Sequence, residues 1–262
     1  MKILRTIATA FAQYSRIPMP RFEWKDEDVC CSLAAFPLVG AVTGALFYAL
    51  FAAGRYLEIP ETALAMLLAA VPLIVTGGFH VDGFMDVADA LSSYRTREEK
   101  LAILKDPHIG AFAVIRLAIY GLIYIASLII VLAFANADGL LIVIAAGFVF
   151  ARALSALSVL TFRSARNEGM LYYEATSAAG ARNMNLAFSF IWIAIASALI
   201  LWSGRVAGAA AIAAAILSFA WYKHLSYKEF GGVTGDTAGY FVVICETAVT
   251  AASALSAVLI KG

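Results

Sequence analysis

Long apolar segments, separated by short polar ones, constrain the fold of this chain more than any other feature. Hydrophobic residues make up 63% of its 262 positions, against about 45–50% in soluble domains. A helix of about 20 apolar residues crosses a bilayer, and it bonds its own backbone polar groups within the segment. We therefore expect an all-α, polytopic integral membrane helical bundle, a single membrane-embedded domain over residues 1–262. It has about seven transmembrane helices (six to eight), with spans near 33–51, 62–75, 111–134, 140–160, 186–202, 206–222 and 238–260.

The distribution of positive charge orients this bundle. With the N-terminus inside, 14 Lys and Arg residues fall in the loops on that side, and only Arg55, Arg205 and Lys261 fall on the other. Such a bias marks the cytoplasmic side of a membrane protein. We expect a cytoplasmic N-terminus, with every loop rich in polar residues on the cytoplasmic face. The net charge of +1 gives no reason to expect nucleic-acid binding.

Apolar residues at positions 3, 4, 7, 8 and 11 fit one face of an N-terminal helix. This helix either lies on the membrane surface or packs as an ordinary helix against the bundle.

The densest polar stretch, residues 76–93, reads TGGFHVDGFMDVADALSS. On a helix, Asp82, Asp86 and Asp89 would share a face about 60° wide. Three carboxylates repel one another unless a cation lies among them, and hard oxygen ligands without thiolates favour Mg²⁺ or Mn²⁺. The alternative is a solvated acidic loop. Nearby, His80 is a candidate base, metal ligand or hydrogen-bonding group at a helix start, and Gly83 is expected to let backbone approach a ligand closely.

Cations follow the acidic stretch in the segment KDPHIG, which contains Lys105 and His108, and at Arg95 and Arg97. Cations beside a metal site suit phosphoryl transfer, because they stabilise the charge that develops on the phosphate. The alternative is that these residues only anchor the loop at the membrane surface.

Two further loops on the same side carry polar groups. The glycine-rich segment 230–239 leads Asp236 into the last span, where it would bind the metal or cap the helix. The loop 162–180, which contains Arg166, would cover a large planar substrate or seat the bundle at the interface. Within the apolar spans, Arg116, Arg152 and Glu246 are charged, and we expect Glu246 either to pair with an arginine or to take part in catalysis.

These features predict a membrane enzyme with a divalent-metal phosphate site facing the cytoplasm. Membrane CDP-alcohol phosphotransferases carry a longer aspartate motif with an Ala-Arg pair that this chain lacks. Aromatic prenyltransferases carry a second aspartate-rich segment that is also missing. A cation transporter is the third alternative, but transporters usually place ionisable groups near mid-membrane in repeated halves.

Several segments in order resemble the cobalamin synthase family, which comprises adenosylcobinamide-GDP ribazoletransferases, also known as cobalamin-5′-phosphate synthases. They are SRIPMP at residues 15–20, FPLVG at 36–40, GGFHVDGFMDVADAL at 77–91, KDPHIGAF at 105–112, RNEG at 166–169 and GGVTGDTAG at 231–239. The chain departs from the family where Ala90 replaces a frequent glycine and where Pro107-His108 replaces a Ser-Arg pair. Neutral imidazole is a poorer partner for an anion than guanidinium is.

The resemblance implies that α-ribazole, or its 5′-phosphate, is joined to adenosylcobinamide-GDP with release of GMP. It also implies Mg²⁺ as cofactor and a multi-pass protein of the bacterial or archaeal cytoplasmic membrane. The assigned roles are metal ligation by Asp82, Asp86 and Asp89, catalysis by His80, Lys105 and Asp236, and substrate binding by Arg95, His108 and Arg166. A homo-oligomer, or association with other cobalamin-assembly enzymes, is a further expectation.

Overall fold

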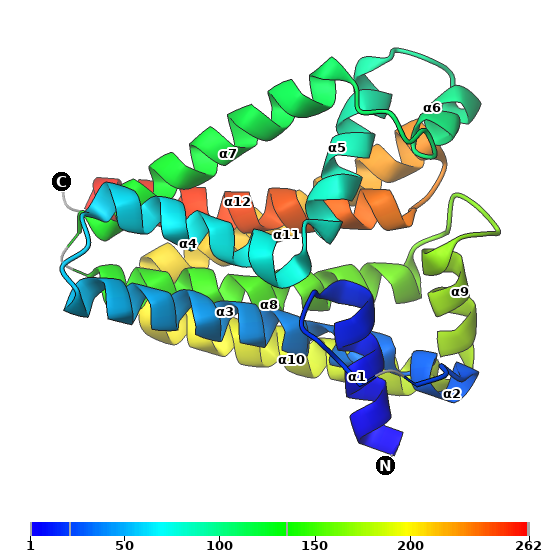
Figure 1. Ribbon diagram of the computed structural model, residues 1–262, viewed down its shortest axis with the longest axis horizontal. Helices are drawn as coiled ribbons and strands as arrows, with labels where there is room; N and C mark the ends of the chain where they lie inside the picture. Colours follow the sequence, from blue (N-terminus) through cyan, green and yellow to red (C-terminus); the bar gives the residue numbers. More distant parts are fainter. Residues whose placement is uncertain (1, 21, 135, 261–262) are drawn as a thin grey trace.

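The computed structural model describes residues 2–20, 22–134 and 136–260, and it is helical throughout (Figure 1). The helices are α1 (Lys2–Tyr14), α2 (Asp26–Val29), α3 (Ser32–Tyr56), α4 (Glu61–Thr76), α5 (Phe79–Ser92), α6 (Arg97–Ile103), α7 (Ala111–Leu132), α8 (Ala137–Thr161), α9 (Met170–Ser177), α10 (Arg182–Gly204), α11 (Val206–Leu225) and α12 (Gly235–Ile260). A 3₁₀ turn (Ala178–Ala181) links α9 to α10, and a π-helical turn (Ser226–Phe230) follows α11. Within these ranges there is no strand, and an isolated bridge pairs Ser164 with Val233.

Six helical units in the described chain are long and apolar enough to cross a membrane: α3, α7, α8, α9–α10, α11 with its π turn, and α12. A seventh span results if α4 and α5 are counted as one broken segment, which bends by 94°. This confirms the predicted all-α membrane bundle and its six to seven spans. The segment predicted at 62–75 forms α4, which is too short to span alone.

The bend between α4 and α5 depends on two adjacent glycines. Gly77 has φ +64° and Gly78 has φ +82°, a left-handed conformation that glycine adopts at little steric cost. The Gly78 amide donates to the carbonyl of Leu73, which closes the end of α4. The chain then turns by 94°, so α5 runs across the direction of the long helices (Figure 1).

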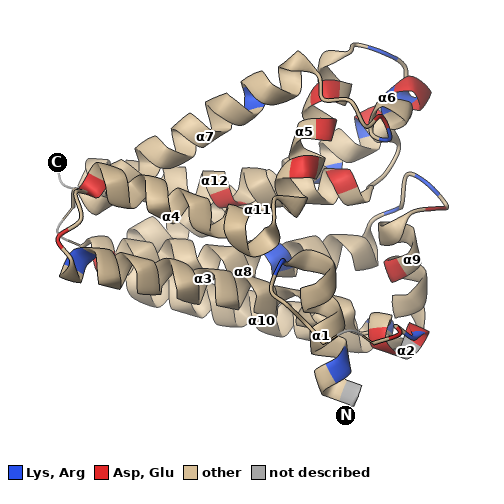
Figure 2. Cartoon of the chain, viewed as in Figure 1, with Lys and Arg blue, Asp and Glu red and all other residues tan. Residues whose placement is uncertain are grey.

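The short helices gather at one end of the bundle. Figure 1 places α2, α5, α6 and α9 at this end, and the C-terminus and the α3–α4 connection at the other. Figure 2 shows that most Lys, Arg, Asp and Glu residues lie at the same end. The polar segments that the sequence separates therefore meet in space, and we refer to this part of the molecule as the polar end.

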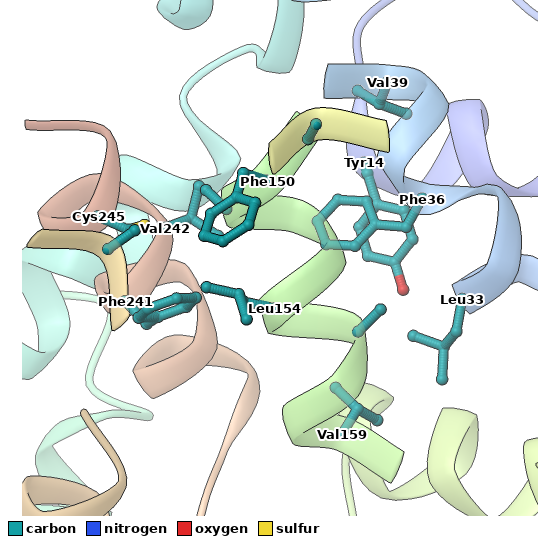
Figure 3. Close-up of a cluster of buried hydrophobic side chains, with 14 of the residues drawn as sticks. Tyr14, Leu33, Phe36, Val39, Phe150, Leu154, Val159, Phe241, Val242 and Cys245 are labelled. Atoms are coloured by element: carbon teal, nitrogen blue, oxygen red, sulfur yellow. The ribbon is translucent and has the colours of Figure 1, made fainter. Parts of the chain in front are cut away.

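Helix α8 is the central helix of the bundle, buried along most of its length between α3, α10 and α12. Figure 3 shows Phe150 and Leu154 of α8 lying between Phe36 on one side and Phe241 of α12 on the other. The approach of α3 to α8 requires small residues, since a Cβ on Gly40 would lie 2.4 Å from the Phe148 carbonyl oxygen. Close packing at small side chains is typical of membrane helices, because lipid provides little hydrophobic driving force between them.

The N-terminal segment forms the predicted amphipathic helix, α1. Its first turn exposes Ile3 and Leu4, whereas Phe11 and Tyr14 are buried against the bundle. The ring of Tyr14 packs against that of Phe36 in α3, with centroids 4.1 Å apart and the planes tilted by 35°. The end of the helix therefore packs against the bundle, as in the second alternative, and its start is exposed; its position on the membrane surface stays a prediction.

Candidate functional site

Helix α5 places the three predicted aspartates on one face. Asp82 is exposed and Asp86 and Asp89 are partly buried, while Phe84 and Val87 on the other side are fully buried. The apolar residues hold the helix against α12 and α7. The predicted helical face of carboxylates is therefore present at the polar end of the bundle.

A fourth carboxylate comes from the first turn of α12. Gly83 allows this approach, because a Cβ at that position would lie 2.8 Å from both the Cα and the carbonyl oxygen of Asp236. The glycine predicted to admit a ligand instead admits the backbone of α12. As a result, Asp82 and Asp236 line one cavity, although they are far apart in the sequence.

The carboxylates are close enough to influence one another. The pKa of Asp86 is raised to about 7, first by partial burial and then by the negative charges of Asp82, Asp236 and Asp89. A carboxyl group surrounded by like charges favours its protonated form, and a bound cation reverses that preference. The cluster therefore carries uncompensated negative charge and oxygen donors of the kind that Mg²⁺ prefers.

The carboxylates are not drawn together into a coordination shell. In the part of the chain that the structure describes, no group of three or more His, Cys, Asp or Glu residues is arranged to hold a metal ion. The donor chemistry fits a hard divalent cation, and the metal assignment itself stays a prediction.

Asp89 already has backbone partners. Its Oδ2 accepts a hydrogen bond from the amide of Gly110 at 2.5 Å, and its Oδ1 accepts one from Ala113 at 2.8 Å. These amides belong to the start of α7, where a helix leaves its first N–H groups without intrahelical partners. Asp89 thus caps α7 from a different helix and holds the end of the KDPHIG segment next to α5.

Cationic residues border the carboxylate cavity, whose volume is about 280 Å³. Arg166 lines it, donates a hydrogen bond to the carbonyl of Leu101 at the polar end, and attracts Asp236 electrostatically. Lys105 forms an ion pair of 2.5 Å with Glu168, which also lines the cavity. The structure therefore brings Arg166 and Lys105 to the cavity and its rim.

Three predicted site residues lie elsewhere. Arg95 is exposed beyond the end of α5, and His108 is 89% exposed with its Nδ1 2.7 Å from Asp106. Neither lines the carboxylate cavity. His80 is buried on the opposite side of α5 from Asp82, against the rings of Phe36 and Phe79. The sequence already indicated that His80 and Asp82 point to opposite sides of the helix, because two residues correspond to a rotation of about 200°.

One charge inside the membrane is paired as predicted. Arg152 Nη1 of α8 lies 2.7 Å from Glu246 Oε1 of α12, and Arg152 is fully buried. A second buried carboxylate escaped sequence analysis. Glu174 in α9 accepts a hydrogen bond from the Tyr14 hydroxyl, 160 positions away, and no local pattern connects the two.

Comparison with known proteins gives the family of the chain. The profile of the cobalamin-5-phosphate synthase family matches residues 6–254. The chain belongs to this family. As a member of the cobalamin-5-phosphate synthase family, it is 39% identical to the adenosylcobinamide-GDP ribazoletransferase of Lachnoclostridium phytofermentans, over 94% of this chain and 92% of the relative.

Other members of the cobalamin-5-phosphate synthase family are similar over nearly their whole length. The enzyme of the same name from Chlorobaculum tepidum is 33% identical over 97% of this chain and 96% of its own. The enzyme of the same name from Clostridium perfringens strain 13 is 31% identical over 94% of this chain and 96% of its own. A search of solved structures found no match.

Proposed function

We propose that this chain transfers the phosphocobinamide part of adenosylcobinamide-GDP to α-ribazole or its 5′-phosphate. The products are GMP and adenosylcobalamin, or adenosylcobalamin 5′-phosphate. The observation that carries the proposal is the cavity at the polar end, in which Asp82 and Asp236 face a space bordered by Arg166. The relatives with this activity in their names align with nearly the whole chain. Asp82, Asp236 and Arg166 all lie within residues 6–254, which the family profile matches.

The reaction breaks a pyrophosphate, so negative charge has to be neutralised. Asp82, Asp86 and Asp89 would hold Mg²⁺, with Asp236 as a fourth carboxylate. Bound there, Mg²⁺ would neutralise the phosphate oxygens and polarise the phosphorus toward attack. Asp89 would bind Mg²⁺ through its remaining lone pairs, because both of its oxygens already accept backbone hydrogen bonds.

The chain's own cations contribute to substrate binding. Arg166 and Lys105 would bind the phosphates as charge develops on the leaving GMP. Arg95 and His108, both exposed at the polar end, would contact the outer part of the nucleotide. The ion pair with Glu168 keeps Lys105 near the rim before substrate arrives.

The 5′ oxygen of the ribazole attacks the phosphorus on the cobinamide side, the bond from that phosphorus to the GMP oxygen breaks, and the 5′ hydroxyl loses its proton. His80 and a carboxylate of the cluster are the two candidate bases. Asp82 and Asp236 line the carboxylate cavity, whereas His80 does not.

The proposed setting is the cytoplasmic membrane, with the polar end facing the cytoplasm. The excess of Lys and Arg in the polar-end loops supports this orientation. The substrates are the partners we propose, together with lipid. A homo-oligomer or a complex with other cobalamin-assembly enzymes remains part of the proposal.

The direct experiment incubates the purified protein with adenosylcobinamide-GDP, α-ribazole and Mg²⁺ and measures GMP. We expect equal amounts of GMP and a cobalamin product. GMP release without a corrinoid product, or its absence in folded protein reconstituted in lipid, contradicts the proposal. Parallel reactions with α-ribazole and with its 5′-phosphate identify the preferred acceptor.

A further inference from the structure

A second cavity, of about 270 Å³, lies within the bundle between α4, α5, α7, α8 and α12. Its wall is mostly apolar and includes the exposed residues Met66 and Leu73 of α4, which places an opening on the lipid-facing side of the bundle. None of the four clustered aspartates lines it. This cavity, which we term the intramembrane cavity, is distinct from the carboxylate cavity at the polar end.

Three side chains line the intramembrane cavity with buried atoms that have no hydrogen-bond partner among the described residues: Arg152, His80 and Tyr124, through its hydroxyl. Arg152 is 0% exposed, and its Nη1 donates to Glu246 and to the carbonyl of Phe148. Its Nε and Nη2 remain unpaired, as does Nε2 of His80, which is 5% exposed. Buried donors are normally satisfied, so unpaired ones beside a cavity indicate a missing acceptor.

The charges around the cavity determine which acceptor is suitable. Arg152 and Glu246 neutralise each other, so an anion entering the cavity would meet the carboxylate of Glu246 as well as the guanidinium. A lipid acyl chain offers no acceptor. An uncharged ring compound with a nitrogen or oxygen acceptor meets both conditions, because its apolar body contacts the wall and its acceptor pairs with the buried donors.

The size of the intramembrane cavity supports a compact ligand. Pockets for drug-sized molecules usually have volumes of about 300–1,000 Å³, and about 270 Å³ lies just below that range. A fused aromatic ring fits this description better than a whole nucleotide or a corrinoid does.

A third, smaller cavity lies between the intramembrane cavity and the carboxylate cavity and shares lining residues with each. His80 lines both the intramembrane cavity and a small cavity of about 50 Å³. That small cavity shares Phe79, Met170, Leu171 and Gly235 with the carboxylate cavity. The three spaces are thus neighbours along α5, with the small cavity between the other two.

We infer that the intramembrane cavity binds the uncharged aromatic base of the nucleoside acceptor, whose one free ring nitrogen accepts a hydrogen bond from Arg152 or His80. The inference rests on the proposed function for the identity of the nucleoside. It assigns His80 a binding role at a site separate from the phosphate chemistry.

Gly121 offers a test that leaves the three polar side chains intact. It lines the intramembrane cavity, and a Cβ added there has no heavy atom within 4 Å. Gly121→Leu should therefore fill the cavity. The matched control is Ala118→Leu on the same helix, at an exposed position that does not line the cavity. The probe is benzimidazole, the ring system of ribazole, titrated into protein in lipid nanodiscs in the absence of nucleotide.

We expect benzimidazole to bind the wild type and Ala118→Leu equally, and Gly121→Leu at least about ten-fold more weakly, with the three melting temperatures alike. Equal binding to Gly121→Leu overturns the inference. So does wild-type affinity weaker than about 10 mM, or a co-purified lipid in the cavity that benzimidazole does not displace.

GMP release separates this inference from the proposed function. Benzimidazole binding that Gly121→Leu weakens, in a protein that releases no GMP, leaves the site standing and removes the proposed function. Normal GMP release by Gly121→Leu, with an unchanged KM for ribazole, leaves the function standing and removes the site.

Discussion

Asp89 in α5 accepts a hydrogen bond from the amide of Gly110, 21 residues further along the chain, at the start of α7. The contact joins the acidic helix to the cationic KDPHIG segment, so the two halves of the candidate phosphate site are held in register. The same carboxylate therefore caps a helix and adds negative charge to the carboxylate cluster.

The two tasks of Asp89 can be separated by substitution. Asp89→Ala removes both, and we expect it to lower the free energy of unfolding by about 0.5–2 kcal/mol, the usual cost of losing a helix cap. Asp89→Asn retains one of the two acceptor oxygens, so it should lose less stability than Asp89→Ala while also weakening Mg²⁺ binding. Thermal unfolding and Mg²⁺ titration of both variants measure the two effects. Equal loss of stability in the two variants would contradict a capping role.

Asp82→Asn and Asp86→Asn should abolish most Mg²⁺-dependent GMP release, with a loss of about 100-fold or more, since each removes a charged ligand from the cluster. Both positions are at least partly exposed, so folding should be preserved. Activity assays with the variants in lipid, checked by their melting temperatures, test this. Near-normal activity in a folded variant would remove the metal assignment.

Mg²⁺ binding should depend on pH around neutrality. The pKa of Asp86 is raised to about 7 in the metal-free protein, so below that pH Mg²⁺ has to displace a proton, and its affinity should fall by up to about ten-fold per pH unit. Between the ordinary pKa of an aspartate and pH 7 the folded state binds more protons than the unfolded one. The metal-free protein should therefore lose stability as the pH rises through this range.

Calorimetric titrations at pH 6 and pH 8 measure the Mg²⁺ affinity, and melting temperatures without metal measure the stability. Asp86→Asn is the matched control, and it should remove most of both dependences. A pH-independent affinity in the wild type would be inconsistent with the raised pKa.

His80 distinguishes catalysis from binding. If His80 is the general base, His80→Ala changes the pH–rate profile of kcat. We expect the profile to keep its shape and the KM for ribazole to rise by about ten-fold, because His80 faces the intramembrane cavity and not the carboxylates. His80→Gln, which retains a hydrogen-bond donor, should recover part of the loss. Loss of a limb of the pH–rate profile of kcat in His80→Ala would instead show that His80 acts as the general base.

The Arg152–Glu246 pair should be a major determinant of stability. Removing one partner leaves a buried charge uncompensated, so Glu246→Leu is expected to cost about 3–5 kcal/mol. The double variant Arg152→Leu/Glu246→Leu should recover much of that loss, because it removes both charges. The coupling is measured by unfolding the wild type, the two single variants and the double variant in detergent. Additive effects of the single substitutions would show that the two side chains act independently.

Much of this protein follows from local sequence. Apolar segments of sufficient length predict the spans, because lipid leaves the backbone no alternative to helical hydrogen bonds. Helical spacing alone places Asp82, Asp86 and Asp89 on one face, and it also places His80 on the other. These properties depend only on neighbours along the chain.

The contacts between distant segments were decided by the tertiary structure. The bend at Gly77-Gly78 directs α5 across the bundle, and Gly83 then admits the start of α12, which brings Asp236 to Asp82. The cap from Asp89 to α7 and the choice of Arg152 as the partner of Glu246 have the same origin. Periodicity specifies the face of a helix but not the helix opposite it, because that choice depends on the path of the backbone and on close packing throughout the bundle.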